Sequence, residues 1–197
     1  MVSHGGGSKN LQAVTDNHQA LTSLGFASEQ IVSMVSNNGG SKNLQAVTDN
    51  YQALKDLDFT SAQIVSMVSN NGGSKNLKAV TENNESLISL GFTSEQIVSM
   101  VSHDGGSKNL KAVTENNESL IALGFTSEQT VSMVSNNGGS KNLQAVTDNH
   151  QALIGLGFTS DQTVSMVSHI GGSKNLQAVT DNNEALKDLG FTSEQIV

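Results

Sequence analysis

The sequence predicts an all-α protein, a solenoid built from repeats of two helices each. The first observation is a strict internal repeat: Gly-Gly-Ser-Lys-Asn-Leu recurs every 33 residues without insertion, starting at residues 6, 39, 72, 105, 138 and 171. The second is the helical spacing of apolar residues within each repeat. A fixed period of this length is typical of a solenoid, in which every repeat buries its apolar face against its neighbours.

The repeat organises the whole chain into a single array. With phenylalanine taken as the first residue, a partial repeat at 1–25 precedes the full repeats and a stub at 191–197 follows them. The full repeats are 26–58, 59–91, 92–124, 125–157 and 158–190. Since Met1 falls in the same column as Met34, we expect the chain to begin inside a repeat, as a piece of a longer array.

Composition argues against several other classes of protein. With one Tyr, no Trp and six Phe spread along the repeats, a single central core cannot be assembled. The absence of cysteine excludes a disulfide framework and a thiolate metal site. No apolar run approaches the ~18 residues of a membrane span, and no signal peptide is visible. We therefore expect a soluble intracellular protein without membrane contact, although the sequence does not identify a compartment.

The first helix of each repeat begins just after the phenylalanine. In the repeat 92–124, Thr93 and Gln96 have the spacing of a capping box, which predicts a helix start. The apolar residues that follow predict a short buried face on a helix of roughly two to three turns. They are Ile97, Val98, Met100 and Val101.

The second helix follows the conserved Gly-Gly-Ser and is expected over 107–124 in the same repeat. Its apolar stripe consists of Leu110, Val113, Leu120 and Leu123. A glycine ends this helix, as a left-handed C-terminal cap requires, with Asp58 as the one exception. The capping glycines are Gly25, Gly91, Gly124, Gly157 and Gly190. Because the chain has no proline, we expect the second helix to be straight.

Two variable residues, the variable pair, precede each Gly-Gly. The first residue is only His or Asn, which predicts one shared duty, a hydrogen bond to a carbonyl at the end of the first helix. These residues are His4, Asn37, Asn70, His103, Asn136 and His169. The second residue varies in size, charge and hydrogen-bonding type, so it has no common structural duty. These residues are Gly5, Asn38, Asn71, Asp104, Asn137 and Ile170. The two glycines that follow are constant, which predicts positive φ or a close approach of the backbone to another group.

The repeat FTSEQIVSMVSHDGGSKNLKAVTENNESLISLG resembles that of the transcription activator-like effectors (TALEs), in which a variable pair between two helices is followed by Gly-Gly. The resemblance covers essentially the whole chain. The 33-residue length and the absence of proline look more like the shorter bacterial relatives, such as the marine TALE-like proteins, than like the plant-pathogen effectors. The resemblance implies a right-handed superhelix that binds double-stranded DNA, one repeat for each base pair, with the loops in the major groove.

The resemblance also implies a role for each residue of the variable pair. The first residue would support the loop, so that Asn37 bonds the carbonyl of Ser33 and its counterparts do likewise. The second residue would contact the base. Asp104 would accept from N4 of cytosine, because a carboxylate has only acceptors to offer.

The other second residues complete an expected site. An asparagine donates to N7 of a purine, with guanine preferred, at Asn38, Asn71 and Asn137. Gly5 leaves room for the thymine methyl group. Ile170 offers only apolar contact, which in the family goes with adenine, while cytosine stays open. The expected site is therefore 5′-TGGCG(A/C)-3′.

Phosphate contacts are expected at the start of the second helix, where the helix dipole and free N–H groups attract anions. The second glycine of each loop is one candidate: Gly7, Gly40, Gly73, Gly106, Gly139 and Gly172. The lysine two residues later is the other: Lys9, Lys42, Lys75, Lys108, Lys141 and Lys174. The family has Lys-Gln where this chain has Ser-Lys, so the role shifts by one residue. The net charge of −8 opposes DNA binding, and only the location of these lysines counters it.

Other functions were weighed against DNA binding. A helical solenoid can also be a scaffold for a protein partner, and this is the main alternative. RNA readers of this type place the reading side chains on helices, not on a Gly-Gly loop. His18 and His150 share a column with Tyr51, Asn84, Asn117 and Asn183, which favours a solvent-facing surface over a metal site. No candidate nucleophile, acid or base is unique to one place, so we expect no enzyme activity, no cofactor, no small-molecule substrate and a monomer.

Overall fold

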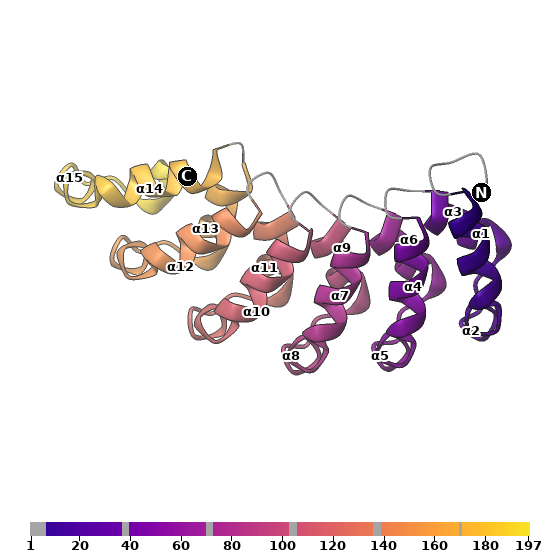
Figure 1. Ribbon diagram of the computed structural model, residues 1–197. Helices are drawn as coiled ribbons and strands as arrows, with labels where there is room; N and C mark the ends of the chain where they lie inside the picture. Colours follow the sequence, from indigo (N-terminus) through magenta and orange to yellow (C-terminus); the bar gives the residue numbers. More distant parts are fainter. Residues whose placement is uncertain (1–6, 37–39, 70–72, 103–105, 136–138, 170) are drawn as a thin grey trace. The chain divides into compact units, whose positions relative to one another are not determined.

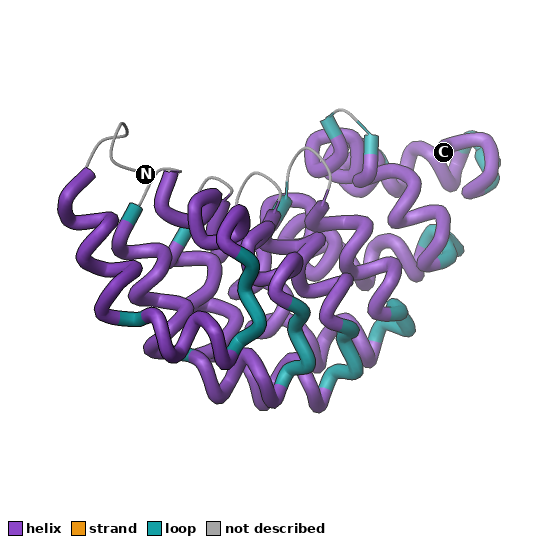
Figure 2. The backbone as a smooth tube through the Cα atoms, turned by 90° about the vertical axis from the view of Figure 1, so that its right-hand side faces the viewer, coloured by secondary structure: helices purple, strands orange, loops and turns teal. Residues whose placement is uncertain are grey.

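The computed structural model describes residues 7–36, 40–69, 73–102, 106–135, 139–169 and 171–197. These residues form helices joined by short connections, and no strand occurs among them (Figure 1 and Figure 2). The first helices of the repeats are α3 (Ser28–Ser36), α6 (Ser61–Ser69), α9 (Ser94–Ser102), α11 (Ser127–Ser135), α13 (Ser160–Ser168) and the short α16 (Ser193–Ile196). The second helices are α1 (Gly7–Asp16) with α2 (His18–Ser23), α4 (Ser41–Asp49) with α5 (Tyr51–Asp56), α7 (Ser74–Glu82) with α8 (Asn84–Ser89), α10 (Gly106–Ala122), α12 (Ser140–Gly155), and α14 (Gly172–Asp181) with α15 (Asn183–Asp188).

The first helix begins at the predicted capping box. The amide of Gln96 donates to Thr93 Oγ1 at 3.2 Å, and Gln96 Oε1 accepts from the amide of Thr93 at 2.9 Å. Two donors that helix geometry leaves without a partner are thus satisfied at the start of α9. The predicted apolar face is buried except at Val98, which is half-buried.

The second helix ends at the predicted left-handed residue. After α2, Gly25 has a φ of 69°, its amide donates to Thr22 O at 3.0 Å, and the amide of Phe26 donates to Leu21 O at 3.2 Å. This pair of bonds is the Schellman motif. Asp58, the exception in sequence, keeps the same backbone with a φ of 54°. The left-handed backbone therefore ends the helix at this position even where aspartate replaces glycine.

The expectation of a straight second helix is wrong for four repeats. Single non-helical residues interrupt it at Asn17, Asn50, Asn83 and Asn182. At Asn17, φ is −107°, and the side-chain Nδ2 donates to Ala13 O at 2.9 Å, beside the backbone amide at 3.2 Å. The side chain and the backbone amide of Asn17 thus compete for the same carbonyl.

The same side-chain bond does not always break the helix. Asn116 Nδ2 donates to Ala112 O at 2.9 Å, yet α10 is continuous through Asn116. The local sequence TENNESLI is shared by the interrupted α7–α8 and the continuous α10. The interruption is therefore a small departure from helical geometry, close to the point at which a helix still counts as continuous.

Two compact units make up the chain, Met1–Ser107 and Lys108–Val197. In the first compact unit, α3 packs on α6 and α6 on α9, while α1 packs on α4 and α4 on α7. In the second, α11 packs on α13 and α12 on α14. First helices thus stack on first helices and second helices on second helices, which is the arrangement of an α-solenoid (Figure 1).

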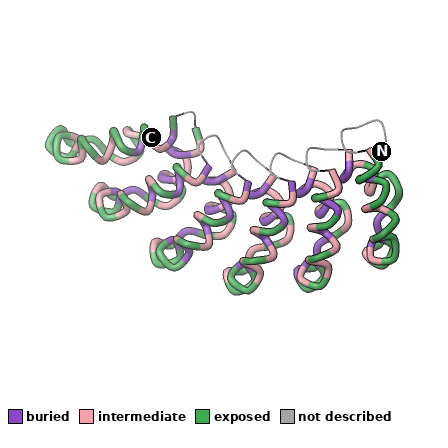
Figure 3. The backbone as a smooth tube through the Cα atoms, in the orientation of Figure 1, coloured by how far each residue is buried: buried purple, intermediate pink, exposed green. Residues whose placement is uncertain are grey.

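The core of each compact unit lies between successive repeats. The side chains of Met34, Leu44 and Val47 are fully buried, as are Met67, Leu77 and Val80 one repeat later. Figure 3 shows buried residues along the helix sides that face neighbouring helices, with exposed residues toward the far ends of the second helices. Each repeat therefore depends on its neighbours for burial of its apolar face.

Candidate nucleic-acid interface

Each loop that holds a variable pair connects the end of a first helix to the start of a second helix. The second residues of the pairs, Gly5, Asn38, Asn71, Asp104, Asn137 and Ile170, lie outside the described residues. So do the first residues His4, Asn37, Asn70, His103 and Asn136. The described flanks of these loops, together with His169, define the candidate interface.

His169 is the one described first residue of a variable pair. It follows directly after α13, is exposed, and has its Nδ1 2.6 Å from the carbonyl oxygen of Ser165. Ser165 occupies the column of Ser33, so this is the contact expected for this column. Because a carbonyl oxygen only accepts, this hydrogen bond requires a proton on Nδ1.

The second glycine of the loop is held against the preceding repeat. Positive φ values of 48°, 43°, 30° and 49° occur at Gly40, Gly73, Gly106 and Gly139. A Cβ atom at Gly40 would lie 2.7 Å from Asn10 Oδ1, which is closer than real Cβ contacts allow. The sequence predicted either a positive φ or a close approach of the backbone to another group, and both occur here. The neighbouring group is a side chain of the protein.

The described glycines of the sixth loop differ from those of the other loops. Gly171 has a φ of 86°, the amide of Gly172 donates to His169 O at 2.9 Å, and Gly172 is already the first residue of α14. Gly7 is likewise the first residue of its helix. The left-handed residue thus falls on the first glycine in the sixth loop and on the second in the four loops from Gly40 to Gly139.

A row of buried asparagines links successive repeats, and sequence reasoning missed its role. Asn43 Nδ2 donates to Val68 O of the next repeat at 3.1 Å and to Met34 O of its own repeat at 3.2 Å. Its Oδ1 accepts the amide of Ser74 in the next repeat at 3.1 Å. The residue is completely buried. The sequence did carry a signal for this role. Asparagine is constant after Gly-Gly-Ser-Lys, at a position on a buried helix face that would otherwise hold an apolar residue.

The same bonds recur along the array. The serine amides of the next repeat donate to the asparagine Oδ1 at 3.0 Å for Asn10, 3.1 Å for Asn76 and 3.0 Å for Asn109. The amides of Ser41, Ser74, Ser107 and Ser140, near the start of the second helix, are therefore bonded within the protein. A protein side chain already occupies each of these donors.

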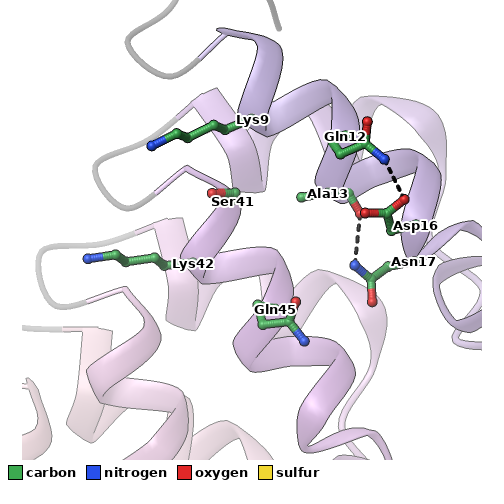
Figure 4. A pocket seen from close by; sticks show the side chains of 8 residues that line it. All are labelled: Lys9, Gln12, Ala13, Asp16, Asn17, Ser41, Lys42 and Gln45. Carbon is green, nitrogen blue, oxygen red and sulfur yellow. Dashed lines mark hydrogen bonds between the residues drawn. The ribbon is translucent and has the colours of Figure 1, made fainter.

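The loop lysines lie in the first turn of the second helix and are exposed in all six repeats. Figure 4 shows Lys9 and Lys42 extending to the same side, beside a shallow groove between α1 and α4. Farther along α1, Gln12 donates to Asp16 at 2.6 Å and lies away from the lysines. Within the described parts of the chain, ion pairs form at Lys78–Glu82 and Lys111–Glu115, one turn beyond the loop lysines.

The acidic side chains of the first helices lie away from the loops. Glu29, Glu95 and Glu128 stand in the first turn of a first helix. Each glutamate is the second residue of a nine-residue helix that runs toward its loop, so it lies about 10 Å along the helix from the loop end. That distance exceeds the Debye length of about 8 Å in physiological salt. The acids therefore act only weakly on an anion at the loop lysines.

The column of His18 and His150 is less exposed than expected. His18 is exposed, but Tyr51, Asn84, His150 and Asn183 are half-buried, and Asn117 is only 9% exposed. Burial lowers the pKa of His150 below its ordinary value of 6.5. No group of three or more His, Asp or Glu side chains suited to a metal ion occurs among the described residues. In the same part of the chain, no helix is long and apolar enough to cross a membrane.

Comparison with known families identifies the repeat. The sequence model of the TAL effector repeat matches residues 5–37, 71–103 and 137–169, which together make up half of the chain. The chain belongs to the TAL effector repeat family. Each match begins at the second residue of one variable pair and ends at the first residue of the next pair. Each matched segment therefore spans one 33-residue repeat of this chain.

TAL effector repeats are DNA-binding modules that bind double-stranded DNA. Membership makes this chain a DNA-binding repeat protein. No curated protein matches the sequence.

Proposed function

We propose that the chain reads double-stranded DNA in a sequence-specific manner, one repeat for each base pair, through its variable pairs in the major groove. The observation that carries the proposal is the exposed lysine repeated beside every loop. A row of ammonium groups at a constant sequence interval suits the regular phosphates of one DNA strand. The array would wind around the duplex as a right-handed superhelix.

The base assignments rest on side-chain chemistry. Asp104 presents acceptors to the N4 amino group of cytosine and would face the acceptors O6 and N7 of guanine without a proton to share. Asparagine at positions 38, 71 and 137 donates to N7 of guanine. Gly5 accommodates thymine, and Ile170 goes with adenine or cytosine. The proposed site is 5′-TGGCG(A/C)-3′.

The net charge of −8 is compatible with this role because of where the charges lie. Lysines stand beside the loops, and the acids of the first helices stand at the opposite ends. Phosphate contacts depend on local charge, whereas the total charge acts at distances that salt screens. We propose that the chain binds as a monomer, without a cofactor, a small-molecule substrate or catalytic activity.

A competition assay tests this function. The full chain is bound to a labelled duplex containing TGGCGA, and unlabelled TGGCGA, TGGCGC and scrambled duplexes of equal composition compete at several salt concentrations. The proposal predicts stronger competition by the two proposed sites than by scrambled DNA. Equal competition by all duplexes would leave only nonspecific binding. No binding to any of these duplexes would favour the protein-scaffold alternative, and stronger competition by an added RNA of the same sequence would favour an RNA reader.

A further inference from the structure

The two ends of a variable loop are held by one side chain from the preceding repeat. Asn76 Nδ2 donates to Val101 O at 3.0 Å, just before the loop that contains the pair His103-Asp104. Asn76 Oδ1 accepts the amide of Ser107 at 3.1 Å, just after that loop. Asn76 belongs to the repeat whose own variable pair is Asn70-Asn71.

This arrangement fixes the span of the loop. A single carboxamide bonds backbone groups that are six positions apart in sequence, so Val101 and Ser107 cannot separate without breaking a buried hydrogen bond. Asn76 is 1% exposed, so water cannot readily replace the lost partner. A short loop with both ends held has far fewer conformations than a free one.

The second glycine completes the contact. A side chain at Gly106, which has a φ of 30°, would collide with the Asn76 carboxamide. Gly139 stands in the same relation to Asn109. The asparagine of one repeat therefore packs directly against the second glycine of the next loop, and the contact needs both residues.

We propose that Asn43, Asn76 and Asn109 are positioning residues for base reading, each acting on the loop of the following repeat. The inference rests on the proposed base-reading function. It predicts that a repeat reads its base accurately only when the preceding repeat supplies the asparagine. The asparagine of one repeat therefore affects the reading of the base assigned to the next repeat. Asn43 acts on the third base, Asn76 on the fourth and Asn109 on the fifth.

Substitution of Asn76 by alanine in the full chain tests the inference. Binding is compared across duplexes that vary only the third base or only the fourth base of TGGCGA. Wild type should discriminate at the fourth base by about tenfold or more, and Asn76→Ala should reduce this to about threefold or less. Discrimination at the third base, read by the same repeat that carries Asn76, should change by less than about twofold.

Two further variants control for a general loss of structure. Asn109→Ala should move the effect to the fifth base. Asn175→Ala should leave the third, fourth and fifth bases unchanged, since no variable pair follows Asn175 in this chain. If Asn76→Ala does not fold, the milder Asn76→Ser takes its place, with circular dichroism to check helicity.

Hydrogen exchange in the free protein tests the hydrogen bond between Asn76 and Ser107 separately from base reading. The amide of Ser107 should exchange at least about tenfold faster in Asn76→Ala than in wild type, because it loses its buried acceptor. Unchanged exchange at Ser107, or loss of discrimination at the third base or at all bases equally, would overturn the inference. A wild-type chain without any base preference would instead overturn the proposed function, and the reading role of the asparagines with it.

Discussion

Gly40 lies so close to Asn10 of the preceding repeat that a Cβ atom on Gly40 would come within 2.7 Å of Asn10 Oδ1. The φ of Gly40 is 48°, in the left-handed region that side chains disfavour. The constant glycine of this loop is thus explained by a contact inside the protein. It would be required even if the chain bound no DNA.

Alanine at Gly40 should therefore destabilise the array. Left-handed backbone and overpacking together cost about 2 to 4 kcal/mol. The matched control is Gly155→Ala, at the end of α12, where the nearest atom to the new Cβ is Lys187 Nζ at 3.6 Å. That change should be neutral or stabilise by about 0.5 to 1 kcal/mol. Urea unfolding midpoints measure both, and equal midpoints for the two variants would refute the steric account.

The loop lysines should contribute affinity without sequence preference. Replacing Lys75 and Lys108 by alanine should weaken binding to every duplex alike and reduce the salt slope by about one to two units, at roughly 0.9 per phosphate. Lys55 and Lys187, in the last turns of α5 and α15, serve as controls and should change the slope little when replaced. The opposite ranking would place the DNA on another face of the repeats.

His150 should make stability depend on pH. Burial lowers its pKa, so the folded state binds protons less readily than the unfolded state, whose pKa is near 6.5. Its contribution is complete above that pKa and is lost as pH falls through the folded value. His150→Asn, which introduces the residue found at Asn84, Asn117 and Asn183, should flatten the decline of melting temperature between about pH 7 and pH 5. An unchanged decline would show that other groups dominate.

The interrupted second helices give a further test. Asn182 is exposed, and its Nδ2 donates to Ala178 O at 2.7 Å. Asn182→Ala should remove this competitor, join α14 to α15 and stabilise by about 0.5 kcal/mol. Asn50→Ala should instead destabilise, because Asn50 Oδ1 accepts from Thr81 Oγ1 of the next repeat at 3.0 Å. Circular dichroism and thermal unfolding distinguish these outcomes.

Local sequence patterns predicted the helix boundaries well. The Thr93–Gln96 box and the glycine caps are short-range features, in which a few adjacent residues satisfy one another's backbone groups. The exception at Asp58 was also visible, since an unusual residue in a glycine column marks the same backbone with a different side chain.

Contacts between repeats were harder to predict. The constancy of Asn43 was plain in the sequence, but its partners, Val68 O and Ser74 N, lie 25 and 31 residues away. The helix interruptions were missed because reasoning from proline alone ignored the asparagine side chain as a competitor. The hydrogen bond of the serine amide near the start of the second helix was missed for the same reason, since its acceptor is a distant asparagine.

The substitution Asp104→Asn tests base reading most directly. It replaces a side chain that only accepts hydrogen bonds with one that also donates, and asparagine already stands in this column at positions 38, 71 and 137. Binding of wild type and variant is measured on four duplexes that differ only at the fourth base of TGGCGA. The account predicts that wild type prefers cytosine and the variant prefers guanine or adenine, a change of ~1–3 kcal/mol in relative affinity, with little change in stability. A variant that keeps the preference for cytosine, or that loses its fold, would contradict it.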